Sequence, residues 1–185
     1  LATPDTTTIY ILTVTDNNNC KDKDSVTVKV NPLPIAKAGN DTAICAGDSV
    51  QLHGQGGTEY YWSPNTNLSD QFIADPVANP NNTTTYYLDI LDTNNCPNKD
   101  TIIITVNPTP TVNMGTDTNI CEGDSVILDA KNIGSSYEWS TTDTTQTITV
   151  NTDGIYWVEA SNNKGCTGRD TIMVIENPNP TIDIG

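Results

Sequence analysis

Apolar and polar residues alternate along most of the chain, in short runs that turn-forming residues separate. The runs are rich in β-branched and aromatic residues, and clusters of Asn, Asp, Gly and Pro interrupt them about every ten residues. No segment repeats its apolar residues with a helical period. Successive side chains of a strand point to opposite faces, so this pattern predicts an all-β protein.

Two consecutive parts of the chain carry matching sets of predicted strands. In the first part we expect strands at 42–45, 48–53, 58–63, 71–74, 85–91 and 100–106. In the second part we expect strands at 118–121, 125–130, 136–140, 146–150, 154–160 and 170–175. Six or seven short strands with regular turn signals are typical of a β-sandwich.

The alternation also predicts which side chains face the core of each sandwich. The last two strands of each part should bury Tyr86, Leu88, Ile90, Ile102, Ile104, Val106, Tyr156, Val158, Ala160, Ile172 and Val174. The second strands should bury Val50, Leu52, Val126 and Leu128. Trp62 and Trp139 should lie at the centre of the third strands, where an indole ring can cover a disulfide.

The chain also repeats itself in sequence. Tyr10, Tyr86 and Tyr156 each precede a cysteine by ten residues, and each of those cysteines precedes an Asn-Pro by eleven. The phrase "ICAGDSV" at 44–50 returns as "ICEGDSV" at 120–126. A fixed period of this size indicates tandem domains. We expect four segments, which are the end of one unit at 1–34, complete units at 35–110 and 111–180, and the start of another at 181–185.

The five cysteines follow this repeat. Each complete unit has an early and a late cysteine, so we predict the disulfides Cys45–Cys96 and Cys121–Cys166. Cys20 holds the late position of the first segment and is predicted to be unpaired. A unit this small has a thin core, and closing a loop of about 45 to 50 residues stabilises it by about 4 kcal/mol in the chain-entropy model. Paired cysteines in small domains indicate an oxidising, extracellular compartment.

Acidic residues dominate the charge of the chain. Its 23 Asp and Glu exceed its 8 Lys and Arg, for a formal net charge of −15. Nucleic acids and anionic membrane surfaces would repel such a chain, so neither is an expected partner. No apolar run approaches the roughly 18 residues that span a bilayer, and no signal-peptide pattern occurs at the amino end. Strand-like sequence begins at once, so we interpret the chain as an excerpt of a longer one.

Groups suited to catalysis are scarce in this sequence. His53 is the only histidine, and it falls in the outward register of its strand, which indicates a solvated surface side chain. Carboxylates recur as turn residues, and no glycine-rich phosphate loop occurs. We therefore predict that the chain is not an enzyme.

Calcium is the one metal for which the sequence offers candidate ligands, and no other cofactor is predicted. Asp41 and Asp117 occupy matched positions beside the linkers between units, and Asp48 and Asp124 follow just beyond. Oxygen-rich junctions of this kind can bind Ca²⁺ and rigidify tandem domains. The alternative is that these aspartates cap the turns before strands, which Asp does without metal.

Several motifs together resemble a known family of repeats. The "NPxP" linkers, the "ICxGDSV" phrase, the tryptophan of the third strand and the "Tyr … NxC … DT-I" ending resemble the Ig-like and PKD-like tandem repeats of Bacteroidota surface proteins. Strict PKD domains carry Trp-Asp-Phe-Gly-Asp-Gly, where this chain has "WSPNTN" and "WSTTDT". The resemblance implies an Ig-like sandwich in a large secreted protein, exported by the type IX system, at the cell surface. Gliding and attachment adhesins belong to that class.

The resemblance also implies sites of O-glycosylation. Bacteroidota modify Ser or Thr in Asp-Ser/Thr when an apolar residue or Thr follows. The pattern occurs at Ser25, Thr42, Ser49, Thr101, Ser125 and Thr171, and also at Thr6 and Thr144. The alternative is that each is simply a turn aspartate followed by a residue that favours strands.

Two functions fit these observations. In the first, the units follow one another end to end through stiff Asn-Pro-x-Pro linkers and form a semi-rigid spacer or filament module of an adhesin. Its partners would be neighbouring repeats and other copies in a filament. In the second, the module binds a carbohydrate or a cell surface through exposed aromatic residues. Candidates for that surface are Tyr60, Tyr61, Phe72 and Trp157.

Overall fold

The structure is a computed structural model that describes residues 1–182. The predicted start of a further unit at 181–185 lies mostly outside the described residues. Contacts divide the chain into two compact units. The first comprises Leu1–Thr42, Ser49–Pro80 and Thr84–Ile104, and the second comprises Ala43–Asp48, Asn81–Thr83 and the chain from Thr105 onward. Over residues 1–182 every regular element is a strand, and no helix there is long and apolar enough to cross a membrane.

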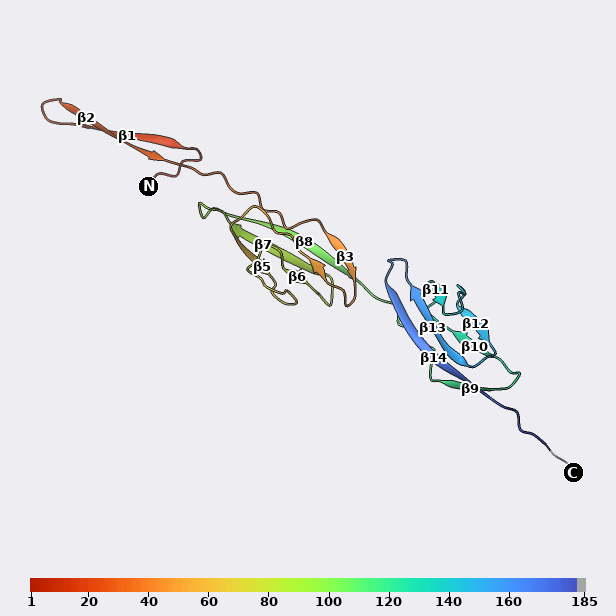
Figure 1. Ribbon diagram of the computed structural model, residues 1–185. Helices are drawn as coiled ribbons and strands as arrows, with labels where there is room; N and C mark the ends of the chain where they lie inside the picture. Colours follow the sequence, from red (N-terminus) through yellow and green to blue (C-terminus); the bar gives the residue numbers. More distant parts are fainter. Residues whose placement is uncertain (183–185) are drawn as a thin grey trace. The chain divides into compact units, whose positions relative to one another are not determined.

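The chain begins with a hairpin of two strands, β1 (Thr8–Thr15) and β2 (Lys21–Val28). They pair antiparallel, with Thr8 opposite Val28 and Thr15 opposite Lys21 (Figure 1). The hairpin corresponds in sequence to the last two strands of each complete repeat. Leu12 is 66% exposed here, whereas its equivalent Leu88 is fully buried. The hairpin therefore has the apolar residues that face the core in the complete repeats, but here these residues are exposed.

The next repeat forms two sheets. The larger sheet has the order β3-β8-β7-β5 and the smaller one pairs β4 with β6. The strands are β3 (Thr42–Cys45), β4 (Val50–Gln51), β5 (Glu59–Ser63), β6 (Val77–Ala78), β7 (Thr84–Leu91) and β8 (Pro97–Asn107). β7 pairs antiparallel with both β5 and β8 (Figure 1).

The last complete repeat has the same plan. Its sheets are β11-β13-β14-β9 and β10-β12, and β9 runs parallel to the end of β14. The strands are β9 (Thr118–Cys121), β10 (Val126–Asp129), β11 (Ser136–Trp139), β12 (Thr147–Val150), β13 (Gly154–Ser161) and β14 (Thr167–Asn177). Figure 1 shows the long β13–β14 hairpin beside the shorter strands of this repeat.

This topology is that of an Ig-like β-sandwich. β11, β13 and β14 take the places of strands C, F and G, and β10 and β12 take those of B and E. A buried tryptophan lies on strand C in both repeats, as Trp62 and Trp139. Near the start of strand F, the Tyr156 hydroxyl donates to the carbonyl of Thr152 at 3.1 Å. A tyrosine bonded back to the preceding corner in this way is a hallmark of such sandwiches.

The core follows the predicted alternation closely. Trp62, Trp139, Tyr86, Leu52 and Leu128 are each less than 4% exposed. The predicted inward residues of the last two strands are likewise buried, namely Leu88, Ile90, Ile102, Ile104, Val158, Ala160, Ile172 and Val174. Four predicted core residues at the sandwich margins are only half-buried, namely Val50, Val106, Val126 and Tyr156.

One predicted strand is wrong. Residues 71–74 form bends, and β6 lies further on at Val77–Ala78. Two isolated hydrogen bonds still reach this segment. The Leu52 N–H donates to the Pro76 carbonyl at 2.9 Å, and the Gly54 N–H donates to the Ala74 carbonyl at 2.8 Å. Pro76 has no N–H to return, so a regular ladder cannot form there.

The predicted disulfides Cys45–Cys96 and Cys121–Cys166 are also wrong. The structure joins Cys45 to Cys166 instead, with 5.5 Å between their Cα atoms, and leaves Cys20, Cys96 and Cys121 free. The early cysteine of a repeat lies beside the end of its last strand, whereas the late cysteine lies just before the start of that strand.

The length of the last strand explains this result. The Ala46 N–H donates to the Asn107 carbonyl at the end of β8, and Cys121 lies opposite Asn177 at the end of β14. Both last strands have 11 residues, which span about 35 Å. A disulfide requires Cα atoms within about 7 Å. The tryptophans consequently cover no disulfide, and the Trp62 Nε1–H donates to the Ile73 carbonyl instead.

Candidate functional site

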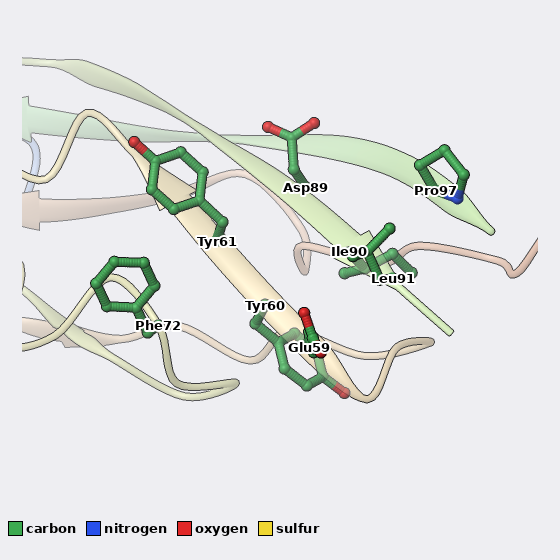
Figure 2. Close-up of a pocket in the computed structure, with 8 residues that line it drawn as sticks. All are labelled: Glu59, Tyr60, Tyr61, Phe72, Asp89, Ile90, Leu91 and Pro97. Carbon is green, nitrogen blue, oxygen red and sulfur yellow. The ribbon is translucent and has the colours of Figure 1, made fainter. Parts of the chain in front are cut away.

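One concave, largely apolar surface of the second repeat is a shallow groove of about 300 Å³ on the β5–β7 face (Figure 2). We call it the Tyr61–Phe72 groove. It is lined by Glu59, Tyr60, Tyr61, Phe72, Asp89, Ile90, Leu91 and Pro97. Three of the four aromatic residues that the sequence predicted for a binding surface line it, and it brings the rings of Tyr61 and Phe72 together, whereas the Tyr60 ring points to the core side of β5 beside Trp62.

Strand register and one loop position the aromatic rings. Tyr61 precedes the buried Trp62 on β5, so its side chain faces outward. Phe72 lies on the following loop, where its N–H donates to the Asp70 carboxylate at 2.8 Å. The rings of Tyr61 and Phe72 are 5.8 Å apart and tilted by 45°, and they are 44% and 64% exposed. The Tyr60 side chain is held in place by a hydrogen bond that its hydroxyl donates to the Gly57 carbonyl at 2.7 Å.

The rim of the groove is acidic. Glu59 and Asp89 are both exposed, and the lining contains no Lys, Arg or His. Exposed ring faces offer apolar contact, and carboxylates accept hydrogen bonds from hydroxyl groups. The groove is therefore chemically suited to a neutral ligand that carries both hydroxyl groups and apolar faces, and unsuited to an anion.

The third repeat lacks the aromatic pair of this groove. Counting from the tryptophan of strand C, the position of Tyr61 is taken by Glu138. Trp157, the fourth predicted aromatic residue, is half-buried under Arg169, whose guanidinium carbon lies 4.1 Å from the ring centroid. A cation held over the ring occupies the face that a ligand would use. Trp157 is therefore not part of an open aromatic surface.

The second candidate site is the disulfide Cys45–Cys166, which lies in the second compact unit. Cys45 ends β3, and we call it and Cys121 strand-end cysteines. Cys166 follows a tight turn before β14, and we call it, Cys96 and Cys20 turn cysteines. The bond joins the strand-end cysteine of one sequence repeat to the turn cysteine of the next repeat.

The linker before the third repeat is bound to the same hairpin turn. The Asn162 side-chain N–H donates to the Pro108 carbonyl at 2.8 Å. At Gly168, a Cβ atom would come within 1.9 Å of the Pro110 carbonyl oxygen, so only glycine allows this approach. The disulfide and the linker contacts thus converge on the turn between β13 and β14.

Three of the four calcium candidates accept hydrogen bonds from backbone N–H groups. Asp41 accepts the N–H of Ile103 at 2.8 Å, and Asp117 accepts the N–H of Met173 at 2.9 Å. Asp48 accepts the N–H of Cys45 at 3.3 Å. Asp124 sits in the corresponding turn after Cys121, where its N–H donates to the Cys121 carbonyl at 2.9 Å. Among residues 1–182, no three acidic, histidine or cysteine side chains come together as a metal-binding group.

The remaining predicted positions lie on the surface. All eight candidate glycosylation positions are exposed, so the hydroxyls can be reached by an enzyme, and intact-mass measurement tests whether they are modified. The His53 side chain is 66% exposed and contacts only Asp75, with Nδ1 3.3 Å from the carboxylate oxygen. The solvated histidine that the sequence predicted is thus confirmed.

Sequence reasoning missed two parts of these sites. It did not identify Glu59, Asp89 and Pro97 as groove residues, because the pairing of β5 with β7 that brings them together is not local. It also assigned Cys166 to the wrong partner. No local sequence signal identifies the true partner, because the contact that holds the linker at this turn joins residues 54 positions apart.

Comparisons with known proteins give loose structural likenesses. No family model matches the chain, and no curated protein matches it significantly. A structure of DIP-gamma Ig1 and Ig2 shares 14% identity over 79% of this chain and 98% of that chain, with a TM-score of 0.40. The insect immune protein hemolin shares 15% identity over 91% of this chain and 56% of its own, with a TM-score of 0.46. With identities near 15%, these likenesses identify no function for this chain.

Proposed function

We propose that this chain is a structural module of a secreted cell-surface adhesin, in which consecutive Ig-like repeats are joined by a disulfide as well as by the backbone. The observation that carries the proposal is the Cys45–Cys166 bond. A disulfide within one small domain stabilises that domain alone, whereas a disulfide between consecutive repeats restricts the motion of the two repeats relative to each other. A restricted joint is what a semi-rigid spacer needs.

The linker supports the same function. Pro108 and Pro110 have fixed φ angles, and each carbonyl is held against the β13–β14 hairpin as described above. A linker of this composition is stiff and short. The repeats should therefore follow one another end to end, with an advance of about 30–40 Å each.

Charge and compartment are consistent with an extracellular spacer. Disulfides persist in oxidising environments outside the cytoplasm. A net charge of −15 keeps copies soluble and apart. Lateral assembly into a filament would accordingly require cations or a specific seam between copies.

Small-angle scattering of the oxidised chain tests this proposal. We expect an extended particle whose pair-distance distribution is the same at low and high ionic strength. The double variant Cys45→Ser, Cys166→Ser should give a broader distribution, and Cys20→Ser is the matched control that should not. A compact particle, in which the two complete repeats fold back on each other, would contradict the spacer function.

A second function is favoured by the Tyr61–Phe72 groove, whose aromatic pair occurs in the sequence of only one of the two complete repeats. We propose as the alternative that this groove binds a neutral carbohydrate of a cell surface. Binding to a glycan array should be lost in Tyr61→Ala and in Phe72→Ala. Tyr87→Ala removes an equally exposed tyrosine outside the groove and should leave binding intact. Failure of the chain to bind any neutral glycan would exclude this function.

A further inference from the structure

The free cysteines Cys96 and Cys121 occupy the same local structures as the two bonded cysteines. We propose that each forms a disulfide of the Cys45–Cys166 kind with an equivalent repeat of the same polypeptide. Cys121 would bond the turn cysteine of a following repeat, and Cys96 would bond the strand-end cysteine of a preceding one. The inference rests on the proposed tandem arrangement of repeats, and it holds whether the module is a spacer or a carbohydrate binder.

The strand-end sites are the same in both repeats. After Cys45 the Asp48 N–H donates to the Cys45 carbonyl at 3.0 Å, and after Cys121 the Asp124 N–H donates to the Cys121 carbonyl at 2.9 Å. The N–H of the residue directly after each cysteine, Ala46 or Glu122, donates at 2.9 Å to the carbonyl of the last residue of the final strand, Asn107 or Asn177.

A glycine with positive φ closes both of these turns. The φ angle is +94° at Gly47 and +88° at Gly123. Cys121 is exposed. The backbone therefore presents the Cys121 thiol in the geometry that it gives the bonded Cys45.

The turn sites are also the same. In the bonded repeat, the Asn162 side-chain oxygen accepts the N–H groups of Lys164 and Cys166 at 2.9 and 3.1 Å. In the preceding repeat, the Asp92 carboxylate accepts the N–H groups of Asn94 and Cys96 at 2.8 and 2.9 Å.

The residue before each turn cysteine has a positive φ, which is 57° at Asn95 and 79° at Gly165. The first hairpin repeats the arrangement, since Asp16 accepts the N–H of Cys20 at 2.8 Å and Asn19 has a φ of 62°. The same turn thus presents a cysteine three times, and one of the three, Cys166, is bonded in this structure.

The linker contact at the turn recurs as well. The Asn98 side-chain N–H donates to the Pro34 carbonyl at 2.7 Å. Asn98 and Pro34 hold the positions of Gly168 and Pro110 in the next repeat, where the Pro110 carbonyl oxygen approaches Gly168 closely. Cys96 therefore lies on the hairpin that binds the incoming linker. The equivalent position in the next repeat is that of Cys166, which is bonded to Cys45. A partner within its own repeat is excluded, because Cys45 and Cys96 lie at opposite ends of β8.

The covalent step is an ordinary thiol–disulfide exchange. Two cysteine thiols lose two protons and two electrons and form one S–S bond. A low-molecular-weight or protein disulfide oxidant accepts them through a mixed disulfide and leaves as two thiols. Outside the cytoplasm such oxidants keep paired cysteines oxidised.

The test for Cys121 adds one repeat at the carboxyl end in register. The elongated chain is residues 1–180 followed by a second copy of 111–185, folded in a glutathione redox buffer and alkylated. Non-reducing peptide mapping should find Cys45 joined to Cys166 and Cys121 joined to the turn cysteine of the added copy. In the control Cys121→Ser, that turn cysteine should be alkylated. An alkylated Cys121, a bond to its own Cys166, or a dimer through Cys121 would overturn the proposal.

The test for Cys96 inserts a repeat instead. The chain is residues 1–110 followed by 35–185, so two copies of the second repeat stand in series. The strand-end cysteine of the first copy should be joined to Cys96 of the second copy, while the Cys45–Cys166 bond of the later repeats remains. This outcome is independent of scattering. A flexible joint with this connectivity would contradict the spacer function alone, and an extended particle with free Cys96 would contradict this inference alone.

Discussion

At the scale of single residues, short polar side chains fix the turns that carry the cysteines. Asp92 and Asn162 hold equivalent positions, and each accepts the N–H of the turn cysteine four residues later. The N–H of Cys96 is the main cause of a lowered pKa at Asp92; desolvation opposes it, and the side chain and N–H of Asn94 lower the pKa further. Hydrogen bonds to the ionised form stabilise that form.

The lowered pKa of Asp92 predicts how the second repeat responds to acid. A carboxyl whose folded pKa is below its unfolded pKa stabilises the fold fully above the unfolded value, and this contribution is lost as pH falls through the folded value. Asp92→Asn should therefore flatten the fall of unfolding free energy below about pH 4. Carboxylate NMR of the wild type should report the depressed pKa directly. Asn162→Asp is the reciprocal control, and it should create a second depressed pKa at the equivalent turn.

Asp41 and Asp117 predict the response to calcium. Each carboxylate already accepts a backbone N–H of the last strand, so we expect both to act as caps rather than as metal ligands. Thermal melting with calcium and with a chelator should give the same midpoint. A midpoint that rises with calcium would assign these residues to a junction site, and Asp41→Asn, which keeps one acceptor oxygen, would then remove the rise.

At the scale of elements, alternation predicts most of the strands and most of the core. Leu88 and Ile90 are buried where the pattern places them, because the period of two is a local property of a strand. The pairing of cysteines is not local. It depends on β9 running parallel to the end of β14, and the sequence does not show which ends of two strands meet. The bend at 71–74 was missed for the same reason, since Pro76 interrupts a ladder whose partner lies elsewhere.

The contact between the linker and β14 gives a prediction at this scale. Gly168→Ala would place a Cβ within 1.9 Å of the Pro110 carbonyl oxygen, so the strand and linker must separate. We expect the free energy of unfolding of the third repeat to fall by about 2–3 kcal/mol, as for other strained backbone sites. Denaturant unfolding measures this loss. Thr167→Ala changes the exposed neighbour and should cost less than about 0.5 kcal/mol.

At the scale of the whole molecule, the disulfide makes two repeats thermodynamically dependent. The bond closes a loop with a sequence separation of 121 residues, which the chain-entropy model values at about 5 kcal/mol. Cys45→Ser with Cys166→Ser should therefore lower the unfolding free energy by about 2–5 kcal/mol, the usual range for a native disulfide. Cys20→Ser, which removes a free thiol, should leave the denaturation midpoint unchanged. Equal midpoints for the double variant and wild type would mean that the bond does not form in solution.

The same bond decides how the chain carries mechanical force. A pull on both ends enters the bond at Cys45 and leaves it at Cys166, so the intervening sequence bears no tension while the sulfurs stay joined. At about 3.5 Å per extended residue, roughly 40 nm of contour length stays hidden until a reductant acts. If Cys121 closes a second loop, the two loops overlap between Cys121 and Cys166. Force then passes from one bond to the next through the chain between Cys121 and Cys166, so the extension of an unfolded adhesin would be limited to such shared segments.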